Sequence, residues 1–244
     1  MDWSQMCADT LSKRLEALDA QLRENGIEPT DAFETEVSVA LTAMTRPLRV
    51  LELFSGTGSV GKVCKQKGWE VVSVDLDERA DITVDIMEWD YWSVGLEMRF
   101  DVVWASPPCT MYSKFQCVHD PDNTRDLGPS NELVQKTMEI ITFFKPRYWF
   151  IENPQTGVLK DQTFMQTLPY HDVDYCMYGY VTRKRTRIWT NYTEFVGKLC
   201  DETCGAYGDN PSPRKARGHP ELPNTLDKRH AIPPRLIRDL MGFA

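Results

Sequence analysis

The sequence predicts a doubly wound α/β fold built on a mostly parallel sheet. Apolar runs with the length and composition of strands occur at 49–54, 70–75, 100–105, 147–152, 173–178 and 187–191. Several runs are separated by stretches that can form helices, and one run, FDVVWA, is apolar on both faces, as expected for a buried strand of a parallel sheet. Ligands of such sheets bind beyond the carboxyl ends of the strands. The residues that follow the runs are therefore the first candidates for a functional site.

The first run ends in a glycine turn. Gly56 and Gly58 follow strand 49–54, and a helix-capable stretch at 59–67 comes next. A unit of strand, glycine turn and helix lets the backbone approach a nucleoside closely, although the third glycine of the dinucleotide fingerprint is absent. Asp75, at the end of the second run, can accept hydrogen bonds from a ribose diol. An ordinary turn between a strand and a helix is the alternative.

Cys109 and Glu152 stand at the ends of two further runs. Cys109 follows run 100–105 and two prolines, which stiffen its backbone. A single cysteine in such a place is commonly a small buried hydrophobe. Glu152 ends run 147–152, where a carboxylate is costly to bury unless it has a partner or a chemical role. We expect the two side chains to lie near each other, because neighbouring parallel strands end at the same edge.

The segment RKRTR carries three alternating arginines. An extended backbone projects Arg183, Arg185 and Arg187 to one face. Three guanidinium groups side by side repel one another unless a carboxylate, a phosphate or a polar base edge lies among them. The alternative is a solvated, charged face.

Four motifs, in this order, resemble the cytosine carbon-5 methyltransferase family. They are LELFSGTG, SPPC, ENP and RxRxR, and the resemblance runs from about Leu48 to Trp189, with a weaker match at 229–240. It implies an S-adenosylmethionine-dependent methyltransferase fold with a very small target-recognition region. It also implies transfer of a methyl group to carbon 5 of cytosine in DNA, with the target base flipped out of the duplex.

The resemblance assigns roles to residues of this chain. It implies that Cys109 is the nucleophile, that Glu152 holds the target cytosine, and that Arg185 and Arg187 lie beside them. The residues implied to hold S-adenosylmethionine are Phe54, Ser55, Gly56, Gly58, Asp75, Leu76, Asp85, Ile86 and Pro107. The departures from the family pattern are Glu52 for aspartate, Ser59 for glycine, Pro154 for valine, Arg183 for glutamine and His230 for asparagine.

The implied chemistry explains why these residue types are needed. A thiolate that adds to carbon 6 of cytosine makes the ring enamine-like, so that carbon 5 can attack the sulfonium methyl. Because the thiolate is the nucleophile, Cys109 needs a positive group nearby, such as Arg185 or Arg187. Glu152 can stabilise the charge that develops on ring nitrogen 3 and can read the exocyclic amine. The sequence does not identify the base that removes the proton from carbon 5.

The chain is long enough for one α/β domain and a small appendage. We expect a helical extension at 1–46, a catalytic core at 47–191, a reduced target-recognition region at 192–224, and a segment at 225–244 that returns to the core. Within the core, the long polar stretch at 110–129 is expected to be a functional loop. Helices are expected at 131–144, near 157–168 and at about 234–243.

The charge is distributed unevenly, although the net charge of −8 argues against nucleic acid at first sight. Residues 183–244 carry 12 Lys and Arg against 7 Asp and Glu, whereas residues 1–182 carry 16 against 29. We therefore expect DNA to bind along the later part. The candidates for contacts with nucleic acid are Ser113, Lys114, Arg183, Lys198, Arg214, Lys215 and Arg217.

A zinc site is also predicted. Cys200 and Cys204 have a spacing found among zinc ligands, and His219 follows them in a region too small to build its own core. The candidates for a fourth ligand are His171, Cys176 and His230. The alternative is a set of incidental reduced cysteines.

No 18-residue apolar stretch and no signal peptide is present in the sequence, so we expect a soluble, monomeric protein of the cytoplasm or nucleus. The short length is typical of a stand-alone viral, phage or prokaryotic enzyme. Three other functions stay open. They are the same chemistry on transfer RNA, a catalytically weak homologue that binds S-adenosylmethionine, and an amino-methyltransferase of adenine or cytosine. Cys109 stands where that last class has a stacking aromatic residue.

Overall fold

The computed structural model describes residues 46–113, 126–209, 217–219 and 225–243. The chain divides into two units, of which one comprises Leu48–Met241 and contains the sheet and the candidate site. The expected helices of the extension at 1–46 lie outside the described residues, as does most of the predicted loop at 110–129.

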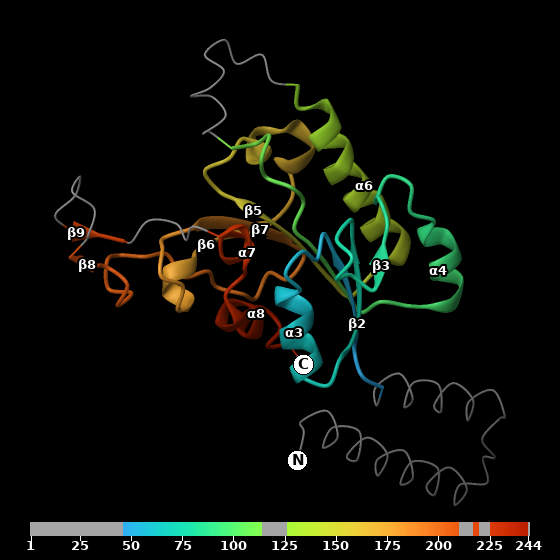
Figure 1. Cartoon of the computed structure of the whole chain (residues 1–244), viewed down its shortest axis with the longest axis horizontal. Helices are drawn as coiled ribbons and strands as arrows, with labels where there is room; N and C mark the ends of the chain where they lie inside the picture. The colour runs from blue at the N-terminus through green and yellow to red at the C-terminus, as the bar shows by residue number, and fades with distance from the viewer. Residues whose placement is uncertain (1–45, 114–125, 210–216, 220–224, 244) are drawn as a thin grey trace, which may run out of the picture. The chain divides into compact units, whose positions relative to one another are not determined.

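A seven-stranded mixed sheet forms the centre of this unit, with the strand order β3-β2-β1-β4-β5-β7-β6 (Figure 1). The strands are β1 (Arg49–Leu53), β2 (Glu70–Asp75), β3 (Ile82–Thr83), β4 (Val102–Ala105), β5 (Tyr148–Pro154), β6 (Tyr170–Asp174) and β7 (Arg185–Thr190). The first five strands of this order run parallel, and β7 runs antiparallel to both β5 and β6. A separate two-stranded sheet pairs β8 (Gly208–Asp209) with β9 (Arg217–Gly218).

Helices cover both faces of the sheet. They are α3 (Ser59–Gln66), α4 (Tyr91–Glu97), α6 (Gly128–Phe144), α7 (Leu226–His230) and α8 (Pro234–Leu240). The short 3₁₀ turns are η1 (Leu159–Asp161), η2 (Thr163–Met165) and η3 (Tyr175–Tyr178). Within the described residues, no helix has both the length and the apolar character that a membrane span requires.

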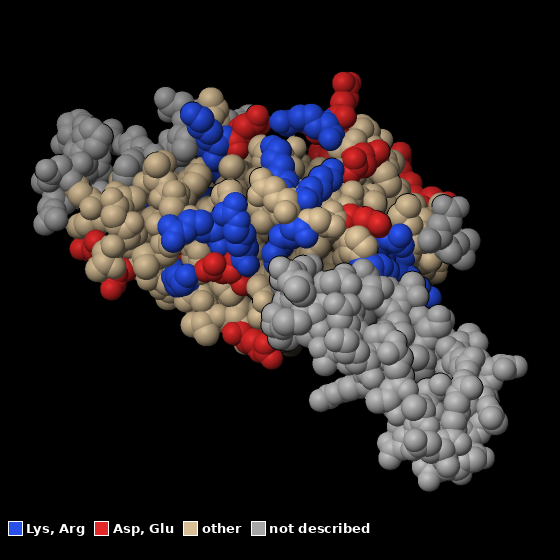
Figure 2. Space-filling view, turned by 90° about the horizontal axis from the view of Figure 1, so that it is seen from below, with Lys and Arg blue, Asp and Glu red and all other residues tan. Residues whose placement is uncertain are grey.

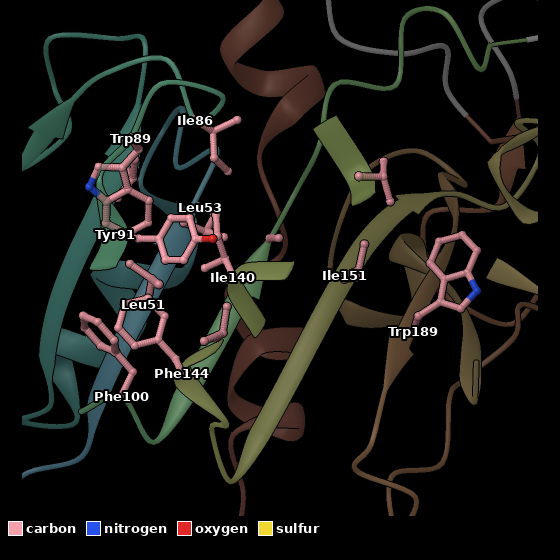
Figure 3. Close-up of a cluster of buried hydrophobic side chains, with 14 of the residues drawn as sticks. Leu51, Leu53, Ile86, Trp89, Tyr91, Phe100, Ile140, Phe144, Ile151 and Trp189 are labelled. Carbon is pink, nitrogen blue, oxygen red and sulfur yellow. The ribbon is translucent and has the colours of Figure 1, made fainter. Parts of the chain in front are cut away.

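The main apolar core lies between the sheet and helices α4 and α6. Leu51 and Leu53 of β1 belong to one cluster with Tyr91, Phe100 and Phe144, and the Phe144 ring packs against the other two rings (Figure 3). Strand residues alternate between the two faces. The other face of β1 and β2 therefore contacts α3, and α8 packs against α3 and η3.

The predicted fold class is confirmed, and five of the six apolar runs are strands β1, β2, β4, β5 and β7. The run at 173–178 is only partly a strand, because β6 ends at Asp174 and the next four residues form η3. The sequence misplaced this strand because β6 begins with the polar residues 170–172 at the edge of the sheet, where one side of a strand has no partner strand.

The stretch near 157–168, expected to be a helix, forms η1 and η2 instead. Its start is fixed by Gly157, where an added Cβ would lie 3.1 Å from the Tyr112 carbonyl oxygen and 3.2 Å from that of Pro154. The backbone then turns with bonds between residues three apart, as in Asp161 N–H to Val158 O. The helices expected at 59–67, 131–144 and 234–243 are confirmed as α3, α6 and α8.

Gly61 lets α3 approach β1 closely, and this contact gives a testable prediction. A Cβ at this position would lie 2.6 Å from Oε2 of the buried Glu52 and 3.1 Å from Cγ1 of Val71. Gly61→Ala should therefore destabilise the protein by about 1–3 kcal/mol, whereas the same change in an exposed helix stabilises by about 1 kcal/mol. Denaturant unfolding measures the difference. Gln66→Ala, on the exposed end of the same helix, is the control, and equal stability of the two variants would contradict the close approach.

Candidate active site

A cavity of about 500 Å³ lies at the carboxyl ends of β1, β2, β4 and β5. Its lining includes most of the residues that the resemblance assigns to S-adenosylmethionine: Phe54, Ser55, Gly56, Asp75, Leu76, Asp85, Ile86 and Pro107. Cys109 and Glu152 line the same cavity. The structure thus brings the predicted nucleophile, the predicted carboxylate and the predicted cofactor residues to one place, as the topology of a parallel sheet requires.

The glycine turn is held by Asp75. Its two carboxylate oxygens accept the N–H groups of Gly56, at 2.8 Å, and of Asp77, at 2.9 Å. Each carboxylate oxygen can accept a further hydrogen bond, so Asp75 can fix the turn and bind a ribose hydroxyl at once. Gly56 (φ 48°) and Phe54 (φ 55°) both adopt the left-handed conformation beside the cavity. The turn and the carboxylate together fit a nucleoside such as the adenosine part of S-adenosylmethionine.

Gly58 does not line the cavity, in contrast to what the resemblance implies. Its φ of 64° makes it the residue from which α3 starts, and an added Cβ would contact only the end of the Lys62 side chain. Ser59, which stands for a glycine, accepts the N–H of Ile232 at 3.2 Å and thereby holds the C-terminal segment against the start of α3.

Glu52 is a second buried carboxylate at this end of the sheet. It is 2% exposed and accepts the N–H groups of Val60, at 3.1 Å, and Gly61, at 2.8 Å. Burial raises the pKa of Glu52 to about 7, although the two amide donors act in the opposite direction. The longer side chain that replaces aspartate thus reaches the first turn of α3 and links β1 to it.

The loop that carries Cys109 is fixed at several points. The side-chain amide of Asn153 donates to the Pro107 carbonyl at 2.9 Å, which joins the end of β5 to this loop. The Tyr112 N–H donates to the Cys109 carbonyl at 3.1 Å, and the Trp104 indole donates to Ser106 at 3.0 Å. The partly exposed Cys109 thiol is therefore presented to the cavity by a rigid backbone.

Burial raises the pKa of the Cys109 thiol, the negative charge of Glu152 raises it further, and the positive charge of Lys184 lowers it. Lys184 lines the cavity, with its Nζ 3.7 Å from Glu152 Oε1. Glu152 is 6% exposed, and its Oε1 accepts the hydroxyl of the fully buried Tyr175 at 2.9 Å. The cation beside the predicted nucleophile and carboxylate is thus a lysine.

The expectation that Arg185 and Arg187 lie beside Cys109 is not met. Arg187 forms a bidentate ion pair with Asp172 of β6, at 2.7 and 2.8 Å, and Arg185 is exposed; neither lines the cavity. The reason is the antiparallel register, in which Arg187 lies opposite Asn153 whereas Glu152 lies opposite Ile188. Side chains of consecutive residues point to opposite faces of the sheet, so the arginines and Glu152 are separated by it.

The residues expected to contact nucleic acid have different surroundings. Arg183 donates to Asp174 and to the Cys200 carbonyl, each at 2.9 Å, and thus supports the fold. Lys198 pairs with Asp239 of α8 at 2.8 Å, and the Ser113 N–H donates to the Thr110 carbonyl at 3.2 Å. Arg217 lies in β9, and the others lie outside the described residues: Lys114, Arg214 and Lys215. On the face drawn in Figure 2, Lys and Arg side chains are interspersed with Asp and Glu.

Cys200, Cys204 and His219 converge as the sequence predicted, together with Cys176. One potential ligand atom from each of the four residues lies within 4.8 Å of the others. The other two candidates for the fourth ligand lie elsewhere. The His171 ring forms a hydrogen bond with the Tyr192 carbonyl at 3.1 Å, and His230 lines the cavity that contains Cys109.

Two residues at the site were missed by sequence reasoning. Lys184 stands between the alternating arginines, and the same alternation that groups them predicts that their neighbours face the other way. This alternation could have predicted that Lys184 faces the side of the sheet opposite to the arginines. Tyr175 has no comparable signal, because its contact with Glu152 depends on where β6 ends and η3 begins.

The strand order, with β7 antiparallel between β5 and β6, and the cavity beyond the glycine turn are those of the S-adenosylmethionine-dependent methyltransferase fold that the resemblance implies. The chain is 38% identical over 222 residues to a Frog virus 3 (isolate Goorha) protein named "Probable DNA (cytosine-5)-methyltransferase"; the match covers 80% of this chain and 100% of the viral one. The chain therefore belongs to the DNA (cytosine-5)-methyltransferase family. No family model matches it.

Solved structures are similar over part of their length. A candidate DNA modification methyltransferase encoded within a prophage, from E. coli, has 18% sequence identity and a TM-score of 0.48, over 63% of this chain and 52% of that one. The Entamoeba histolytica methyltransferase EhMeth has 15% identity and a TM-score of 0.45, over 64% of this chain and 56% of that one. The chain thus spans little more than half the length of these solved chains.

The raised pKa of Glu52 predicts a pH-dependent stability. Because the pKa rises from 4.5 to about 7 on folding, the native protein keeps a proton that the unfolded chain releases in this window. The associated stability is present below about pH 4.5 and is lost as the pH rises through about 7. We expect the difference in unfolding free energy between wild type and Glu52→Gln to fall by about 3 kcal/mol across this window. Denaturant unfolding at several pH values measures it, and parallel curves would contradict the shift.

Proposed function

We propose that this protein transfers a methyl group from S-adenosylmethionine to carbon 5 of cytosine in DNA through a covalent adduct at Cys109. The observation that carries the proposal is that Cys109 and Glu152 line one cavity with the glycine turn and Asp75. DNA is proposed as the substrate because it stands in the name of the Frog virus 3 relative, all of which is covered by the match to 80% of this chain. A flipped cytosine is the form of the base that can enter such a cavity.

Each residue has a defined part in the proposed reaction. The Cys109 sulfur adds to carbon 6 of the ring, and carbon 5 then takes the methyl group that S-adenosylmethionine supplies. A base removes the proton from carbon 5, the bond between carbon 6 and sulfur breaks, and the Cys109 thiolate is regenerated. Glu152 binds ring nitrogen 3 and the exocyclic amine, where hydrogen bonding to the developing charge lowers the barrier.

Lys184 is the cation that we assign to the attack step. Its position, 3.7 Å from Glu152, and its lowering of the Cys109 pKa support this assignment. The ammonium group favours the thiolate over the thiol. Lys184 therefore has the role of the positive group beside the nucleophile, which the resemblance assigns to Arg185 and Arg187.

The cofactor residues lie around the glycine turn. We propose that Asp75 binds the ribose hydroxyls and that Phe54, Leu76 and Ile86 contact the adenosine. We also propose a structural zinc ion in the target-recognition region at 192–224, where Cys200, Cys204 and His219 would hold it.

A covalent trap tests the nucleophile. A DNA duplex that contains 5-fluorocytosine should form a stable adduct with the wild-type protein in the presence of S-adenosylmethionine, because fluorine cannot leave carbon 5 as a proton does. Cys109→Ser should give no adduct and should lose methyl transfer by at least about 10³-fold. Denaturing gel electrophoresis and peptide mass spectrometry detect the adduct.

The control for the trap is the same duplex with unmodified cytosine, which should turn over without trapping. A 5-fluorocytosine transfer RNA tests the RNA alternative in parallel. Trapping of RNA but not DNA would overturn the DNA assignment and keep the chemistry. An active Cys109→Ser enzyme would exclude the covalent route, and an inactive wild type that still binds S-adenosylmethionine would favour the weak homologue.

The role of Lys184 can be tested by its effect on pH dependence. Loss of the positive charge in Lys184→Met should raise the pKa of Cys109 further, so both alkylation of Cys109 and methyl transfer should need a higher pH. We expect the rate near pH 7 to fall about tenfold and to recover partly in alkaline buffer. Iodoacetamide labelling followed by peptide mass spectrometry measures the thiol. Lys136→Met, on α6, is the control. An unshifted profile for Lys184→Met would exclude the assignment.

A further inference from the structure

We infer that Cys176 completes a Cys₃His zinc site with Cys200, Cys204 and His219, and that the bound ion keeps Tyr175 in its hydrogen bond to Glu152. The choice of the four metal ligands does not depend on the proposed methyl transfer. The link to Glu152 does rest on the proposed function, because it takes this carboxylate to act in methyl transfer.

The distances fit a tetrahedral metal site. His219 Nε2 lies 3.5 Å from Cys200 Sγ and 3.1 Å from Cys204 Sγ, and all four ligand atoms lie within 4.8 Å of one another. Zinc bonds of about 2.3 Å to sulfur and about 2.0 Å to nitrogen place tetrahedral ligands roughly 3.5–3.8 Å apart. Cys176, Cys200 and Cys204 are all free thiols. Three sulfurs and an imidazole ring therefore surround a point that a metal ion fits.

The backbone around the sulfurs has the features of a built site. The Glu202 N–H donates to Cys200 Sγ at 3.3 Å. The turn that carries Cys200 and Cys204 uses two residues in the left-handed conformation, which are Glu202 (φ 78°) and Gly205 (φ 74°). Amide donors aimed at sulfur stabilise thiolates, and such outer contacts orient the ligands of a metal.

A metal also explains how this segment is held. At its start, the Cys200 N–H donates to Asp174 at 2.8 Å, and Arg183 bonds the Cys200 carbonyl. At its end, the β8–β9 pair comprises only two residues on each strand and brings His219 back to the two cysteines. Neutral thiols are weak hydrogen-bonding groups. A zinc ion would supply the strong bonds that a segment without its own core needs.

Cys176 connects the metal site to the active site. It is 1% exposed in η3, and the preceding residue, Tyr175, donates its hydroxyl to Glu152 Oε1 at 2.9 Å. The Tyr175 N–H also donates to the Lys184 carbonyl, at 3.1 Å. A 3₁₀ turn of four residues has few internal bonds to stabilise it. A metal bond to Cys176 would fix this turn, which makes Tyr175 a positioning residue for Glu152.

Metal analysis of the full-length protein tests the site. We expect about one zinc ion per chain, released by a thiol-blocking mercurial and detected by a colorimetric chelator. Cys176→Ala, Cys204→Ala and His219→Ala should each lose most of the zinc, while Cys64→Ala, in α3, should keep it. Calorimetry with S-adenosylhomocysteine reports whether each variant remains folded. Zinc-free wild type, or a mass two protons lower from a disulfide among these cysteines, would overturn the site.

Tyr175→Phe tests the link to Glu152, because it removes one hydroxyl and keeps the buried ring. We expect full zinc content, an unchanged KM for S-adenosylmethionine, and a kcat about tenfold or more below wild type. His219→Ala should show a similar loss of kcat. Normal kcat in both variants would overturn the link while leaving the zinc site in place.

A readout that does not need activity separates the inference from the proposed function. Removal of zinc should speed hydrogen exchange in peptides that cover η3 and the end of β5, and should leave peptides of α6 unchanged. If the wild type methylates no nucleic acid, the proposed function fails, and zinc content with hydrogen exchange still decides the inference. Unchanged exchange in η3 after zinc loss would overturn it.

Discussion

A buried carboxylate at the end of a strand needs donors and a positive charge nearby, and Glu152 obtains both from segments that are distant in sequence. Its hydrogen bond comes from Tyr175 in η3, and its cation is Lys184, just before β7. The two are themselves joined, because the Tyr175 N–H donates to the Lys184 carbonyl. The next residue of β5, Asn153, holds the Cys109 loop. The end of β5 thus sets the geometry of both the proposed nucleophile and the proposed cytosine-binding group.

The two buried carboxylates of the site differ in what satisfies them. Glu52 accepts two backbone N–H groups from the start of α3, which are fixed by the helix. Glu152 accepts a hydrogen bond from the Tyr175 hydroxyl and lies beside the Lys184 ammonium group. Both are side-chain groups, which can rearrange when a cytosine binds. The first arrangement favours a structural role in linking β1 to α3. The second leaves acceptor capacity for a substrate, which is what a group that binds the edge of a cytosine requires.

The sequence predicted the location of Cys109 and Glu152 because that location depends only on finding apolar strands and knowing that parallel strands end together. It failed for Arg185 and Arg187 for a specific reason. Alternation correctly grouped the arginines on one face, but the pairing of Arg187 with Asn153 decides which face, and that register is set by tertiary contacts. The same limit explains Cys176. Cys200 and Cys204 are close in sequence, whereas Cys176 joins them only because β6 stops early and η3 turns inward.

The arginines that were expected at the active site stabilise the edge of the sheet instead. Asp172 and Asp174 of β6 lie opposite Arg187 and Arg185 of β7, and opposite charges across neighbouring strands stabilise their pairing. Arg187 forms an ion pair with Asp172. Arg183 forms an ion pair with Asp174 and donates a hydrogen bond to the Cys200 carbonyl. A polar edge strand is thereby anchored, and the segment that follows Cys200 is anchored with it. Because β6 leads directly into η3, the ion pairs at this edge and the hydrogen bond to Glu152 lie on one continuous piece of chain. The arginine block therefore supports the proposed active site through the position of β6, and not through contact with the cavity.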